Sequence, residues 1–221
     1  MHTPYYEPSR YLIFKYVGDN WRLLGYIDAW SKYRSSQHKI IVSRGFTWLA
    51  IENQGASGSG VASYFDEVYL VTPKRVIKAF SYMSEGSQYG GPNSTNREFS
   101  GRVLDCSISN SVVTAEIEYS VTYVSRDLIL FTKKQKAVFS KGVGDQRERF
   151  DGARSNLSNE ELEAVYNIDT LSDEDFLKYN YEELSQIALS GDVERREWLV
   201  QFLETCENSI EHRGLKKMMA R

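Results

Sequence analysis

The sequence predicts an α+β protein in which an antiparallel β-sheet, curved or sandwich-like, is followed by a C-terminal segment of three helices packed on it. Runs of β-branched and aromatic residues, separated by Gly, Asn and Ser turns, fill the first two-thirds of the chain. Residues 113–124 alternate between apolar and polar side chains, which is typical of a strand with one wet face. From residue 157 onward, helix-capping signals and apolar stripes at helical spacing take over.

The β-rich region opens with a predicted hairpin over residues 11–30, whose turn is Gly18-Asp19-Asn20. Glycine-rich and polar stretches at 55–60 and 84–97 are predicted to be connections between strands. The remaining predicted strands cover residues 39–42, 46–51, 64–71, 75–83, 102–109, 113–124 and 128–139.

Two capping boxes mark helix starts in the last third. Ser158 with Glu161, and Ser172 with Asp175, place a hydroxyl and a carboxylate three residues apart, and each box is flanked by apolar residues that can form a hydrophobic staple. A final amphipathic stripe predicts the last helix, and it consists of Leu199, Phe202, Leu203, Cys206 and Ile210. We therefore expect a β-rich domain over residues 1–145 and a helical C-terminal segment over 155–221, joined by an exposed connection.

Charge is unevenly distributed between these two parts. Residues 1–150 hold 19 Lys and Arg against 14 Asp and Glu, a net of +5, whereas residues 151–221 hold 8 against 16, a net of −8. This asymmetry favours either opposite partners or docking of the two parts on each other. No apolar run reaches the ~18–20 residues of a membrane span. The N-terminus lacks a signal-peptide pattern, which leaves two locations open: the cytoplasm, or export with the signal peptide already removed.

Residues that could hold a metal or a nucleotide do not cluster. Cys106, Cys206 and the three histidines have no ligand spacing, so two separate free thiols and no metal are predicted. The glycine-rich stretch 55–60 lacks the Gly-Lys-Ser/Thr sequence and the following helix of a phosphate-binding loop. We therefore predict no cofactor.

The leading functional hypothesis is a non-enzymatic binding or interaction module that uses its polar-aromatic loops. Residues 30–38, 55–64 and 86–96 are too polar for a core, and they carry the Trp and Tyr residues favoured at binding hot spots. The partner is expected to be a macromolecule or a small polar ligand. The predicted binding residues are Trp30, Tyr33, Ser57, Tyr64 and Tyr89.

Two other classes of function stay open. An enzyme could assemble its site from dispersed residues that no motif reveals. A weak nucleic-acid binder could use a basic, aromatic sheet surface, although the isoelectric point of about 5.7 disfavours nucleic acid as a partner.

Overall fold

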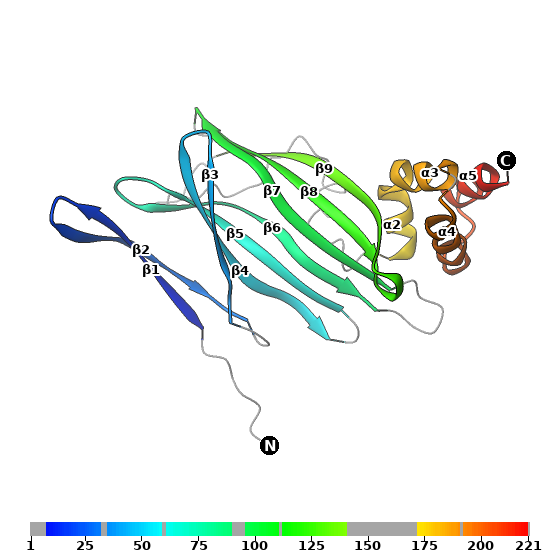
Figure 1. Cartoon of the computed structure of the whole chain (residues 1–221), viewed down its shortest axis with the longest axis horizontal. Helices are drawn as coiled ribbons and strands as arrows, with labels where there is room; N and C mark the ends of the chain where they lie inside the picture. Colours follow the sequence, from blue (N-terminus) through cyan, green and yellow to red (C-terminus); the bar gives the residue numbers. More distant parts are fainter. Residues whose placement is uncertain are drawn as a thin grey trace, which may run out of the picture.

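The computed structural model describes residues 8–31, 35–58, 61–89, 96–110, 112–140, 172–190 and 192–220. It shows the predicted α+β arrangement, in which a curled antiparallel sheet precedes the C-terminal helices (Figure 1). A two-stranded ribbon comprises β1 (Ser9–Val17) and β2 (Asn20–Ala29). The seven-stranded sheet comprises β3 (His38–Ser43), β4 (Phe46–Gly58), β5 (Val61–Val71), β6 (Val76–Gln88), β7 (Arg97–Ser109), β8 (Val112–Tyr123) and β9 (Leu128–Ser140).

The seven-stranded sheet is a meander, in which each strand pairs with the next along the chain. In such a meander every second connection lies at the same end. The β2–β3, β4–β5, β6–β7 and β8–β9 connections therefore share one end of the sheet, and the short 3₁₀ helix η1 (Val124–Arg126) belongs to the last of them. The three polar-aromatic segments singled out in the sequence thus start and finish at one end of the sheet.

The sheet curls because β6 and β7 pair over only a short stretch, from Glu85 opposite Ser100 to Gln88 opposite Arg97. Gly101 lies where the two strands begin to part, and a Cβ there would fall 2.1 Å from the Met83 carbonyl oxygen. Only glycine permits that approach of two backbones. Beyond this point the inner faces of the two halves meet, and the rings of Phe80 and Phe139 stack at 5.0 Å.

Burial along β8 follows the predicted alternation. Val113, Ala115, Ile117, Tyr119 and Val121 face the interior, and the intervening polar residues are partly exposed. At the opposite end of the sheet, the β3–β4 turn closes over β7, because the Ser43 hydroxyl and the Arg44 guanidinium both donate to the Asp105 carboxylate. The interior of the curled sheet and the apolar faces of the C-terminal helices together form the main core.

The C-terminal part forms four helices within residues 172–220: α2 (Asp173–Tyr179), α3 (Tyr181–Leu189), α4 (Val193–Thr205) and α5 (Ile210–Met219). The helix predicted to begin after Ser172 is divided at Asn180 into α2 and α3. The last predicted helix is divided at residues 206–209 into α4 and α5. The helix expected after Ser158, and the connection between the two parts, lie outside the described residues. No helix in the described segments is long and apolar enough to cross a membrane.

Candidate functional site

The β1–β2 hairpin exposes a row of large apolar side chains on its outer face. In the strand register Leu12 lies opposite Tyr26, Phe14 opposite Leu23, and Tyr16 opposite Trp21. These six side chains, which we call the hairpin ladder, are between 48% and 69% exposed. Paired neighbours of this kind contact each other, and an apolar face of a sheet is normally covered by another layer. Apart from the Arg10 guanidinium, which lies 4.7 Å from the centre of the Tyr26 ring, no described residue covers the ladder.

The inner face of the same hairpin is packed. Ile27 and Ala29 are buried with Ile51 of β4, and Tyr11 and Ile13 pack against this small cluster. The base of the hairpin is held by the backbone of Trp30, whose N–H donates to Asn53 Oδ1 at 3.0 Å and whose carbonyl accepts from the Gln54 N–H at 2.9 Å. These contacts fix which face of the hairpin is presented to solvent.

Beyond its packed base, the hairpin is separated from the sheet by a groove of about 510 Å³. Phe14, Lys15 and Leu24 line its hairpin side, and residues 45–47 and 70–73 line its sheet side. In Figure 1 the tip of the hairpin extends beyond the sheet, on the side away from the C-terminal helices. The hairpin is therefore anchored at its base and stands clear of the sheet toward its tip.

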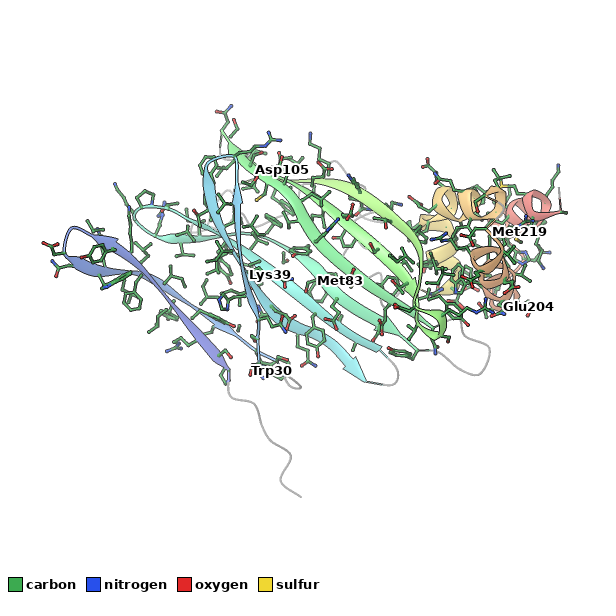
Figure 2. The ribbon with its side chains drawn as sticks, in the orientation of Figure 1. Trp30, Lys39, Met83, Asp105, Glu204 and Met219 are labelled. Carbon is green, nitrogen blue, oxygen red and sulfur yellow. The ribbon has the colours of Figure 1, made fainter. Side chains whose placement is uncertain are left out.

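The residues predicted to bind a partner are placed differently from one another. Trp30 is exposed and lies at the end of the sheet opposite Asp105 (Figure 2). Tyr64 is part of β5 and is only 8% exposed, so its ring is not available as a surface contact. Tyr33 and the side chain of Ser57 lie outside the described residues; the Ser57 backbone continues β4, so the glycine-rich stretch belongs in part to a hairpin.

Tyr89 is exposed and lies beside a small polar pocket of about 400 Å³, whose lining includes Glu85, Glu98 and Thr122. Its hydroxyl donates to Glu98 Oε1 at 2.6 Å. This hydrogen bond, with partial burial and the Glu98 charge, raises the pKa of Tyr89, which therefore remains a neutral donor. Trp30 and Tyr89 remain the exposed candidates among the predicted binding residues.

A buried carboxylate, Asp66, lies on the inner face of β5. Its Oδ2 accepts from the Tyr82 hydroxyl at 2.7 Å and from Lys39 Nζ at 3.3 Å. Burial, and then the neighbouring Asp66 charge, raise the pKa of Tyr82, so the phenol stays protonated and donates. Tyr82 and Lys39 thus stabilise the buried Asp66 charge inside the sheet, which is a structural role.

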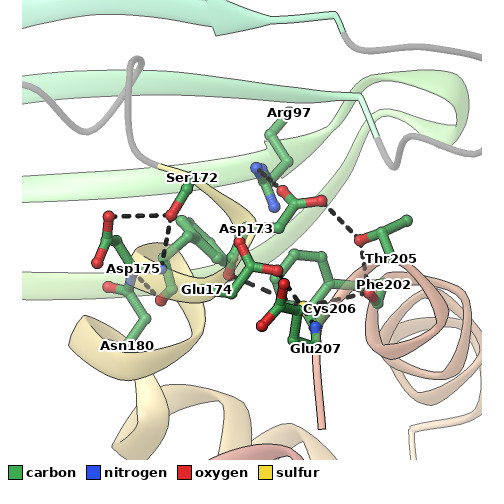
Figure 3. Close-up of polar contacts among 11 residues, drawn as sticks. Arg97, Ser172, Asp173, Glu174, Asp175, Asn180, Phe202, Thr205, Cys206 and Glu207 are labelled. Atoms are coloured by element: carbon green, nitrogen blue, oxygen red, sulfur yellow. Dashed lines mark hydrogen bonds and ion pairs between the residues drawn. The ribbon is translucent and has the colours of Figure 1, made fainter. Parts of the chain in front are cut away.

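A second buried charge joins the sheet to the helices (Figure 3). The Arg97 guanidinium, 2% exposed, donates to Asp173 Oδ1 at 2.7 Å and lies over the rings of Phe176 and Phe202. Thr205 donates to the other oxygen of Asp173 at 2.6 Å. Burial lowers the pKa of Arg97, an effect that the Asp173 charge opposes. The contact between the helices and the sheet thus includes an ion pair whose guanidinium is desolvated and packed on aromatic rings.

The thiols of Cys106 and Cys206 are free, as predicted. Burial raises the pKa of each to about 12, which leaves both protonated and unreactive near neutral pH. Among the described residues, no group of three His, Cys, Asp or Glu side chains is arranged to hold a metal ion. Neither thiol is therefore placed as a nucleophile or a metal ligand.

The hairpin ladder was missed by reasoning from the sequence, although a signal for it is present. Residues 11–14 are apolar at every position, so both faces of β1 are apolar. A two-stranded ribbon can cover only one of its faces against the sheet beneath it. When every position of an edge hairpin is apolar, the face that the sheet does not cover is therefore expected to bind a partner.

No family model matches the chain, and no curated protein and no solved structure is significantly similar to it.

Proposed function

We propose that the protein is a non-enzymatic interaction module that docks on another protein molecule through the outer face of its β1–β2 hairpin. The observation that carries the proposal is the hairpin ladder: three directly paired rows of large apolar side chains, each about half or more exposed. A contiguous exposed patch of this kind is typical of a protein–protein contact.

The composition of the ladder supports a protein partner. Tyr and Trp are favoured at the centres of protein interfaces, and Tyr16, Trp21 and Tyr26 make up half of the ladder. The hairpin carries Arg10, Lys15 and Arg22 against Asp19 and Asp28, a net charge of +1. So small a charge gives little attraction to a phosphate backbone.

The ladder is also pre-organised for docking. The buried cluster beneath the hairpin and the Trp30 backbone hydrogen bonds hold its base on β4. Residues already paired in strands lose less conformational entropy on binding than residues of a loop would, which increases the affinity available from a given contact area.

The proposal is tested by photocrosslinking from the ladder. A benzophenone amino acid replaces Trp21 in the full chain, and a matched probe replaces Val193, an equally exposed apolar residue at the start of α4. Irradiation of the protein in an extract of its source cells should give discrete protein–protein adducts from position 21, and none from position 193.

The adducts from position 21 should disappear when Phe14→Ser and Leu23→Ser are added, because these substitutions remove the middle row of the ladder. If the position-21 probe gives no adducts in a chain without these two substitutions, or if positions 21 and 193 give equal adducts, the proposal is overturned. Adducts that persist in the Phe14→Ser, Leu23→Ser variant would overturn it as well.

A further inference from the structure

We infer that the partner of the hairpin ladder is a second copy of this chain, so that two hairpins pack face to face about a two-fold axis. This inference rests on the proposed function, because it names the molecule that the ladder binds. Three features of the hairpin support it: the area of the ladder, its row order and the position of its charges.

The exposed area is sufficient for a stable dimer. Side chains of this size carry about 150–250 Å² each. With between 48% and 69% of each side chain exposed, the six would bury roughly 500–850 Å² per chain, a range that includes the ~800 Å² per partner of a standard interface. The rest can come from the backbone of the two strands and from residues at the rim.

The order of the residues in the rows makes the ladder complementary to itself. A two-fold axis that runs along the hairpin between its strands lays β1 of each copy over β2 of the other, so that Phe14 lies against Leu23 of the partner copy. Leu12 lies against Tyr26 in the same way, and Tyr16 against Trp21. Each leucine thus meets an aromatic ring, as interdigitation of two apolar layers requires.

The charges next to the ladder are placed to pair in the same arrangement. One row below Leu12 and Tyr26, Arg10 lies opposite Asp28 and donates to both of its oxygens, at 2.6 and 3.0 Å. The two-fold axis brings Arg10 of each copy to Asp28 of the other, which gives two symmetric attractive contacts at the base of the interface.

The first measurement is the mass of the purified full chain by sedimentation equilibrium over a wide range of concentration. The weight-average mass should rise from 25.4 kDa toward twice that value. The Phe14→Ser, Leu23→Ser variant should remain at the monomer mass, whereas Val193→Ser should dimerise like the original protein. A constant monomer mass for the original protein would overturn the inference.

Charge reversal tests the arrangement without removing any apolar contact. Asp28→Arg places like charges together at the base of the interface and should weaken dimerisation about tenfold, as expected for loss of a partly exposed charge contact. Adding Arg10→Asp restores the pair within each chain as well as the contact between chains, and dimerisation should recover. An Asp28→Arg protein that dimerises as well as the original would overturn the two-fold arrangement.

Failure of this inference is distinguishable from failure of the proposed function. If the protein is monomeric but position 21 crosslinks to a different protein, the hairpin remains an interaction site and only the second copy is excluded. If position 21 gives no adduct and the chain is monomeric, both proposals are refuted. An adduct of twice the chain mass, lost in the Phe14→Ser, Leu23→Ser variant, would support both.

Discussion

The β1–β2 hairpin and the C-terminal helices both pack on the curled sheet, but they differ in how much of their apolar side chains is exposed. The helices bury theirs: Phe176, Leu184, Trp198 and Phe202 are almost completely inaccessible to solvent. The hairpin buries a few side chains at its base and leaves six larger ones exposed. The same chemical property therefore stabilises the fold in one region and is left available for a partner in the other.

The charged groups of the two regions differ in the same sense. Arg97 is buried on aromatic rings and pairs with the partly buried Asp173, so that loss of Asp173 leaves a buried charge. Arg10 and Asp28 meet on the surface of the hairpin, where water solvates either group if the other is removed. Stability should respond strongly to changes among the helices and weakly to equivalent changes on the hairpin.

The largest expected effect comes from an aromatic ring in each region. Phe202→Ala leaves a cavity among Phe176, Trp198 and Arg97 and should lower the free energy of unfolding by about 3–5 kcal/mol. Trp21→Ala removes a larger ring from a solvated face, where it packs against Tyr16, and should change this free energy by no more than about 1 kcal/mol. Denaturant unfolding at low protein concentration, where self-association contributes nothing, measures both values.

A loss for Trp21→Ala comparable to that for Phe202→Ala would show that the hairpin ladder is covered within a single chain. The contrast between the two regions, and with it the proposed function, would then be lost.

The next effect concerns the two ion pairs. Asp173→Asn removes the charge facing the buried Arg97, and its NH₂ group replaces one of the two oxygens that accept from Arg97 and Thr205, so we expect a loss of about 3 kcal/mol. Asp28→Asn removes the charge facing the exposed Arg10 and should leave the unfolding curve unchanged. Equal effects of the two substitutions, measured by denaturant unfolding, would contradict the difference in burial.

How far the sequence predicts this structure depends on whether the deciding contacts are local. The alternation over residues 113–124 and the turn at Gly18-Asp19 are local signals, and β8 and the β1–β2 hairpin form where they predict. The curl is different, because it depends on Gly101 approaching Met83 and on Phe80 reaching Phe139. Contacts between residues so far apart in the chain leave no periodic pattern in the sequence from which they could be predicted.

The candidate site was less predictable than the fold for a related reason. Tyr64 is predicted both as the first residue of a strand and as the exposed last residue of the polar segment 55–64, yet β5 begins earlier and turns its ring into the protein. For the hairpin, residues 11–14 indicate two apolar faces, but only the tertiary packing decides that Tyr11 and Ile13 are covered and Leu12 and Phe14 are not. Which face of the hairpin is buried depends on contacts with residues far away in the chain, so a local sequence pattern does not decide it.

The smallest effect tests a local signal within the helical region. The Ser172 hydroxyl accepts from the Asp175 N–H at 3.1 Å and donates to the Asp175 carboxylate, so Ser172 is the predicted N-cap of α2. Ser172→Ala should cost about 0.5–2 kcal/mol of unfolding free energy, since an N-terminal amide loses its acceptor. Ser185→Ala is the matched control: its hydroxyl only donates to the Tyr181 carbonyl within α3, and alanine has the higher helix propensity there. We expect that variant to be unchanged or slightly more stable. Because α2 also carries Asp173 and Phe176, a Ser172→Ala protein as stable as the Ser185→Ala protein would mean that the junction with the sheet holds α2 in place without its cap.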